Sequence, residues 1–185
     1  MAADLALTSY REAKFEPHAG PFLFEFQRDG LDRGSCIKLD TFFSQVPKDF
    51  KYAVEIRNAG LLGPAYRKVL GTHGVAHVYN HWYSIPPLAE QHQRMECFTA
   101  PITVLRLLTP IKMTYEAAKK RAEPYTTIVG ELPNMVELIQ KAAGEHRRAY
   151  VLGNNRGERN APLTVQALVR ALQVENPSVN DQEPR

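Results

Sequence analysis

The stretch KYAVEIRN, from Lys51 to Asn58, decides the fold that the sequence predicts. Successive side chains of a strand point to opposite faces of its sheet. One face of this stretch is apolar and holds Tyr52, Val54 and Ile56. The other face begins at Ala53 and ends with the charged residues Glu55 and Arg57. An apolar face suits a covering helix, and ligands of α/β proteins bind at the carboxyl ends of parallel strands. The stretch therefore predicts a buried strand with a site at its end.

The charged pair at the end of this strand has two interpretations. Either charge would be costly to bury without a partner. Glu55 and Arg57 therefore belong either to a ligand site or to an ion pair that only fixes the packing. Both interpretations stay open at the level of the sequence.

Four further segments predict strands, and helical patterns separate them. The strands are 22–26 (FLFEF), 75–80, 102–108 (ITVLRLL) and 148–152. The first predicted helix runs from Ile37 to Phe43 and is closed by Pro47, and the second starts at Gly63-Pro64 with Tyr66, Val69 and Leu70 inward. A longer helical region from Thr114 to Lys141 is interrupted at Pro124 and at 130–133. The last helix runs from Asn160 to about Leu172. Residues 5–15 have weak helical character, and a long polar loop is expected after Asn80. Such alternation predicts a parallel sheet with right-handed crossovers.

The composition is that of an ordinary globular domain. Of 185 residues, 44% are hydrophobic and 23% are charged, and this length and composition predict one domain over 1–185. Within it we expect a folded core from about 20 to 173 and a flexible tail from 174 to 185. A net charge of +3 argues against nucleic acid as a partner. No apolar run approaches the ~20 residues that cross a bilayer, so no membrane partner is expected. Cys36 and Cys97 form no CxxC pair, which favours reduced thiols and a cytoplasmic location.

Five segments together resemble a known family. They are GPFLFEFQ, PKDFKYAVEIRN, THGVAHVYNHW, TVLRLL and YVLGNNRGERNAPLTVQAL. From about Gly20 to Leu172 they are similar to the YecE-like family, domain of unknown function 72, most specifically in AVEIR (53–57) and in Asn154-Asn155 followed by Asn160-Ala161. The resemblance implies a TIM-type (β/α)8 barrel with its shared polar residues at the carboxyl ends of the strands. It implies no secure activity, and the cofactor is unknown.

The chain departs from the family in motif and in length. The family's seventh strand usually reads Arg-x-His-Gly, whereas Arg106 is followed by Leu107, so a mechanism that uses that histidine is not available. The resemblance aligns the five predicted strands with family strands four to eight, and nothing aligns with strands one to three. We therefore expect a partial barrel of about five β/α units, from a split or truncated gene or from part of a longer product.

A partial barrel would leave two sheet edges and one sheet face without cover. We expect Leu23, Val104 and Leu152 on that face to be partly wet. Open edges also favour pairing with another chain. The expected partners are a second copy of the chain or a second polypeptide that supplies the missing strands.

The candidate site residues lie on these strands or directly after them. Alternation aims Glu25, Glu55, Arg57 and Arg106 at the barrel interior, and Asn80, His81, Asn154 and Asn155 lie at strand ends. Glu25 and Glu55 are the catalytic candidates, and the other six are ligand-binding candidates. Guanidinium forks and amides suit an anionic or polyhydroxyl small molecule. As an acid or base Glu55 needs a raised pKa, against which Arg57 acts.

Two other groups of residues have the composition of a site. His73, His77 and His81 stand four apart, but four strand residues span about 13 Å, too far for one metal ion, so no metal site is predicted. Trp82 and Tyr83 either stack on a sugar or base or pack the loop down, and packing is the favoured reading.

Two functions remain open. One is a small-molecule enzyme with its site at the barrel mouth. The other is a non-catalytic half-barrel that binds a ligand or a partner chain.

Overall fold

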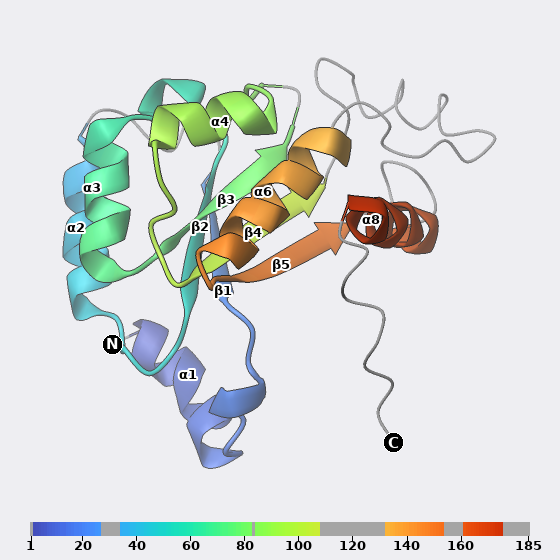
Figure 1. The fold of residues 1–185 in the computed structure, drawn as a ribbon. Coiled ribbons are helices and arrows are strands. Elements are labelled where there is room, and N and C mark those ends of the chain that lie inside the picture. Colours follow the sequence, from blue (N-terminus) through green and yellow to red (C-terminus); the bar gives the residue numbers. More distant parts are fainter. Residues whose placement is uncertain (1, 27–33, 83, 108–131, 154–160, 176–185) are drawn as a thin grey trace.

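The computed structural model describes residues 2–26, 34–82, 84–107, 132–153 and 161–175. Five parallel strands form one sheet in which the strands follow each other in chain order (Figure 1). They are β1 (Phe22–Phe26), β2 (Tyr52–Ile56), β3 (Ala76–His81), β4 (Ile102–Leu107) and β5 (Arg148–Gly153). Each predicted strand is present. The central strand is one residue shorter at its start and two residues shorter at its end than the stretch 51–58, and the other four strands differ by at most one residue.

The helices pack on a single face of this sheet. They are α1 (Ala2–Glu12), α2 (Ser35–Gln45), α3 (Pro64–His73), α4 (Leu88–Met95), α6 (Leu132–Gly144) and α8 (Ala161–Glu175), and two short 3-10 helices are η1 (Glu16–His18) and η3 (Ala59–Leu61). The buried residues of the helices pack against the strand side chains on this face and form two apolar clusters with them. No helix among the described residues is long and apolar enough to cross a membrane.

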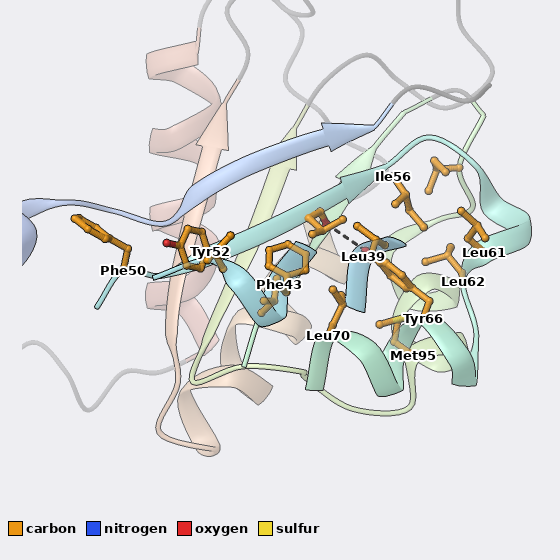
Figure 2. Close-up of a cluster of buried hydrophobic side chains, with 14 of the residues drawn as sticks. Leu39, Phe43, Phe50, Tyr52, Ile56, Leu61, Leu62, Tyr66, Leu70 and Met95 are labelled. Atoms are coloured by element: carbon orange, nitrogen blue, oxygen red, sulfur yellow. Dashed lines mark hydrogen bonds between the residues drawn. The ribbon is translucent and has the colours of Figure 1, made fainter. Parts of the chain in front are cut away.

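The first cluster lies between β2 and the helices α2 and α3. Phe43, Tyr66 and Leu70 pack there against Val54 and Ile56, and Figure 2 shows Phe43, Tyr66, Leu70 and Ile56 converging. All five residues are at most 1% exposed. Burying such a side chain stabilises a protein by about 1.5–3 kcal/mol, so this cluster anchors the central strand.

The opposite face of the sheet, here called the far face, is apolar over most of its length. Its cluster contains Ala53, Ala76, Val78, Ala100, Ile102 and Val104, with Leu23 and Tyr150 partly buried beside it. The expectation for Val104 is wrong, because this residue is 0% exposed. Leu23 is partly buried and Leu152 is 44% exposed, as expected for the strands at the two edges. The far face is therefore buried in its middle and exposed to solvent at β5.

Helix α1 packs at the amino ends of the first two strands. The ring of Tyr10 meets those of Phe22 and Phe50 at centroid distances of 5.2 and 6.3 Å. Leu7 is buried in the first cluster, on the side of the sheet that the other helices cover. Arg11 reaches Asp49 at 2.8 Å. The first helix therefore extends the helical layer and does not cover the far face.

Three helix predictions need correction. The polar loop expected after Asn80 contains α4, whose buried residues are Leu88, Gln91 and Met95. The helix predicted from Ile37 begins earlier, at Ser35; Ile37 is 73% exposed, and Ser35, Leu39 and Phe43 form the buried stripe of α2. Helix α6 starts at Leu132 and runs to Gly144, so Pro133 lies in its first turn and does not interrupt it. The predicted region from Thr114 to 131 and the cap at Asn160 lie outside the described residues.

A buried histidine links β3 to the helical layer. His77 is 3% exposed, with its Nδ1 atom 3.3 Å from the Tyr66 hydroxyl and its Nε2 atom 3.4 Å from Gln91 Oε1. Because the Gln91 amide nitrogen donates to two carbonyls, its oxygen must accept, and His77 carries its proton on Nε2. Burial lowers the pKa of His77 from 6.5 to about 4, which keeps the ring neutral.

We expect this histidine to make folding acid-sensitive. A depressed histidine pKa gives stability that is complete above the unfolded value and is lost as pH falls from 6.5 toward 4, a loss of about 3 kcal/mol. Urea unfolding of wild type and His77→Gln across this range measures it, with the exposed His18→Gln as control. A His77→Gln variant with the wild-type pH slope would contradict the prediction.

Candidate functional site

Two carboxylates stand side by side on the far face. In the parallel ladder between β1 and β2, Glu25 is the register partner of Glu55. Register partners point to the same face, so both side chains leave the sheet together, one residue before the carboxyl end of each strand. Two negative charges this close need cations between them.

Two arginines supply those cations. Arg57 Nη2 lies 2.8 Å from Glu55 Oε1 and 3.0 Å from Glu25 Oε1. Arg106 Nη1 lies 2.6 Å from Glu55 Oε2 and also 2.6 Å from Glu25 Oε2. Each carboxylate thus gives one oxygen to each guanidinium, and the four side chains close into a ring with no net charge. We call Glu25, Glu55, Arg57 and Arg106 the ion ring.

The bonds of the ion ring are not equivalent. Arg57 donates a hydrogen bond to Glu25, and Arg106 donates to both glutamates. The approach of Arg57 to Glu55 Oε1 is an ion pair without a well-directed hydrogen bond, and that oxygen has no hydrogen-bond donor among the described residues. Glu55 is therefore the less satisfied of the two carboxylates.

One half of the ion ring is buried and the other half faces solvent. The side chains of Glu55 and Arg57 are 0% and 8% exposed, whereas those of Glu25 and Arg106 are 32% and 31% exposed. A molecule that approaches from solvent would meet Glu25 and Arg106 first. Their partners lie behind them, in the dry part of the far face.

The two carboxylates have pKa values shifted in opposite directions. Burial raises the pKa of Glu55 above its usual range, and the contacts with Arg106 and Arg57 do not fully offset it. Burial also acts on Glu25, but there the hydrogen bond from Arg106 and the charge of Arg57 outweigh it and lower the pKa. The same contacts raise the pKa of Arg106 despite its own burial. Glu55 therefore keeps a proton to higher pH than Glu25.

Trp82, just after β3, holds Arg57 in place. The guanidinium carbon of Arg57 lies 4.3 Å from the centre of the Trp82 ring, and Trp82 packs against the first apolar cluster. The indole thus serves as a packing surface, the favoured of its two predicted roles. Tyr83 lies outside the described residues.

Asn80 lies on the far face next to the ion ring. It is the register partner of Arg106 and is fully buried. Its side-chain nitrogen donates to the Ile56 carbonyl at 3.2 Å. Its side-chain oxygen Oδ1 is buried and accepts no hydrogen bond from any described residue. A buried acceptor without a donor costs about 1–3 kcal/mol, so Oδ1 is an unsatisfied acceptor beside the ion ring.

Gln91, which the sequence reasoning missed, fixes the backbone of Asn80. The β2–β3 ladder pairs only Ala53 with Ala76 and Val54 with His77. Beyond it, Gln91 accepts from the Asn80 amide at 3.3 Å and donates to its carbonyl at 2.8 Å. The available signal was the spacing of Leu88, Gln91 and Met95, which places them on one face of a helix.

The remaining predicted residues are not part of this arrangement. His81 is buried and pairs in register with Leu107, whose side chain packs in the helical layer, so His81 points away from the ion ring. This corrects its predicted place, and alternation after Asn80 gives the reason. Asn154 and Asn155 lie outside the described residues. His73 ends α3 and contacts Asp40 at 2.7 Å. Among the described residues no group of three potential ligands could hold a metal ion.

A family profile and two solved structures are similar to this chain, and all three concern the same family. The sequence profile of a family described as "Protein of unknown function DUF72" matches residues 2–185. No curated protein matches the chain. A crystal structure of a DUF72 family protein from Thermotoga maritima is similar in fold, with a TM-score of 0.68 and 17% identity, over 90% of this chain and 64% of that one. A DUF72 family protein from Enterococcus faecalis gives a TM-score of 0.58 and 17% identity, over 88% and 66%. The chain thus spans about two thirds of the length of each.

Proposed function

Since the chain belongs to the family of proteins of unknown function DUF72, its activity has to be inferred from its own residues, and we propose that it is a five-unit portion of a TIM-type (β/α)8 barrel that binds a polyhydroxyl small molecule at the ion ring. Glu55 and Glu25 act on this molecule as a proton donor and an ionised carboxylate.

Three features of the sheet support a partial barrel. The strands are all parallel and follow in chain order, and the helices occupy a single face. Doubly wound sheets place helices on both faces, whereas a barrel keeps them outside and fills the inside with strand side chains. The far face has the alternating small and branched apolar residues of such an interior. The ion ring then lies at the carboxyl ends of the strands, where barrel enzymes have their active sites.

The charge balance of the ion ring favours a neutral, hydroxyl-rich ligand. Each hydroxyl group can donate to the exposed carboxylate of Glu25 and can accept from the exposed guanidinium of Arg106. An anion would gain from Arg106 but would be repelled by Glu25, the other exposed member of the ring. Exchanging bonds with hydroxyls leaves the ring neutral, so a polyol or sugar is the better fit of the two predicted ligand classes.

The opposite pKa shifts of the two glutamates are the observation that carries the catalytic proposal. Neighbouring carboxyl groups whose environments separate their pKa values commonly divide the roles of acid and base. Glu55, buried behind Glu25 and with a raised pKa, is the group of the pair that keeps a proton to higher pH, and it can supply that proton to a ligand that displaces Glu25. Glu25, exposed and with a lowered pKa, stays ionised and stabilises positive charge that develops on the ligand.

We expect neutral sugars to bind and raise the melting temperature, and Glu25→Gln to weaken that binding at least tenfold. The amide keeps the shape of the side chain but loses the charge that Arg57 and Arg106 hold. Thermal-shift titrations with neutral monosaccharides, sugar acids and apolar compounds measure this. Glu90→Gln is the matched control, because its partner Arg94 is an exposed neighbour on α4. Stabilisation by apolar compounds alone would refute the proposal.

A second candidate is a non-catalytic assembly protein. Among the described strands β1 and β5 each have one neighbour only, and Leu152, Val165 and Val169 are exposed around β5. If these surfaces bind another chain and no sugar binds at the ion ring, the function of the chain is assembly with that partner and not catalysis.

A further inference from the structure

A groove of about 670 Å³ lies along α3, away from the ion ring. One wall is the helix itself, with Arg67, Lys68 and Gly71. The other wall is the segment 97–101 that leads into β4, together with Arg147 just before β5. The volume is in the range of about 300–1,000 Å³ that small-molecule sites occupy. Gly74, segment 97–101 and Arg147 line the groove and precede β3, β4 and β5, so the groove lies toward the amino ends of these strands.

The charged residues that line this groove are all cationic. They are Arg67, Lys68 and Arg147. Arg67 contacts Glu96, and Arg147 contacts Glu145 at 2.8 Å, from carboxylates that do not line the groove and are 60% and 40% exposed. Exposed ion pairs of this kind contribute little, so a dianion can displace them. The Lys68 ammonium has no acidic partner within the described part of the chain.

Arg147 is already held in position. Its Nη1 atom donates to the Ala100 carbonyl, and its guanidinium lies 5.6 Å from the centre of the Phe98 ring. Its Nε atom donates to Glu145, so Nη2 is the guanidinium nitrogen that these contacts leave for a ligand. An immobilised guanidinium loses little freedom on binding, which favours affinity for a planar or tetrahedral oxyanion.

Gly71 gives an independent indication that the groove is kept open. It lies in the last turn of α3, where glycine is less favourable than alanine. A Cβ atom built at this position meets nothing within 4 Å, so packing does not require glycine. The missing side chain instead leaves free the wall of the groove between Lys68 and segment 97–101.

We propose that this groove binds a phosphorylated small molecule. The phosphate lies among Arg67, Lys68 and Arg147, and the organic part lies along Gly71 and Phe98. Arginine forks and a lysine point charge are the donors that phosphate oxygens prefer. The site shares no residue with the ion ring, so it does not depend on the function proposed above.

The test uses phenyl phosphate as the probe, because it carries a dianion and a ring but no hydroxyl groups for the ion ring. In an NMR titration of the full chain we expect the amide signals of Gly71 and Thr99 to shift and phenol to shift neither. Lys68→Glu should weaken binding at least tenfold. Lys38→Glu, the same charge change at an exposed position of α2, should leave the affinity unchanged.

Gly71→Ala separates binding from folding. We expect an unchanged or higher melting temperature together with at least fivefold weaker binding, because the methyl group favours the helix but enters the groove. Two results would overturn the proposal: unmoved signals of Gly71 and Thr99 at saturating probe, or equal loss of affinity in Lys68→Glu and Lys38→Glu.

Discussion

Arg57→Ala is expected to destabilise the folded chain by about 3–5 kcal/mol. Glu55 has no exposed surface and shares its charge between two guanidiniums, so loss of Arg57 leaves half of a buried carboxylate without a counterion. The contact between Arg57 and Trp82 is lost as well. Urea unfolding at a fixed protein concentration measures the change, since association would shift the apparent stability.

Two further variants show whether the unpaired charge of Glu55 causes the loss of stability. Arg67→Ala removes a partly exposed arginine from its pair with Glu96 and should change stability by no more than about 1 kcal/mol. The double variant Arg57→Met with Glu55→Leu removes both buried charges and should recover much of the loss. A double variant as unstable as Arg57→Ala, or an Arg57→Ala variant as stable as wild type, would contradict this account of the ion ring.

The second large effect concerns assembly. We expect the isolated chain to sediment at micromolar concentration as a dimer or larger species, or to need a second polypeptide, and not to form a stable monomer. Among the described strands β1 and β5 each have one neighbour only, which favours pairing with another chain, and Leu152 on β5 and Val165 and Val169 on α8 are 44%, 47% and 46% exposed. Each apolar side chain left in water forfeits about 1.5–3 kcal/mol, against a net stability of about 5–15 kcal/mol.

Surface variants of α8 locate the contact. Val165→Lys with Val169→Lys should reduce association, because the two valines lie one turn apart and are exposed on α8, the helix that contacts the edge strand β5. Gln166→Lys with Gln173→Lys adds the same charge at other exposed positions of α8 and should not. A compact monomer with one cooperative unfolding transition would show instead that the open edges are tolerated.

The opposite pKa shifts of the glutamates illustrate the limit of sequence reasoning at the site. The sequence placed a carboxylate and an arginine on one face of the central strand, and it identified Arg57 as an influence that lowers the pKa of Glu55. Burial outweighs that influence, because Glu55 lies behind Glu25 and Arg106 and is fully covered. Burial depends on every neighbouring strand, so no local pattern reveals it.

Alternation and helical spacing are local properties, and the sequence by itself therefore determined what depends on them. It determined the five strands, the helices that separate them except α4, and the shared face of Glu25, Glu55, Arg57 and Arg106, because a side chain's direction follows from its position in its own strand. The same rule separates His81 from Asn80. Tertiary structure alone decided the β1–β2 register that sets Glu25 beside Glu55 and the docking of α4 that brings Gln91 to Asn80. It also decided the burial that raises one glutamate pKa while the other falls. These depend on contacts between residues far apart in the chain, and such contacts form only when the sheet and its helices pack together.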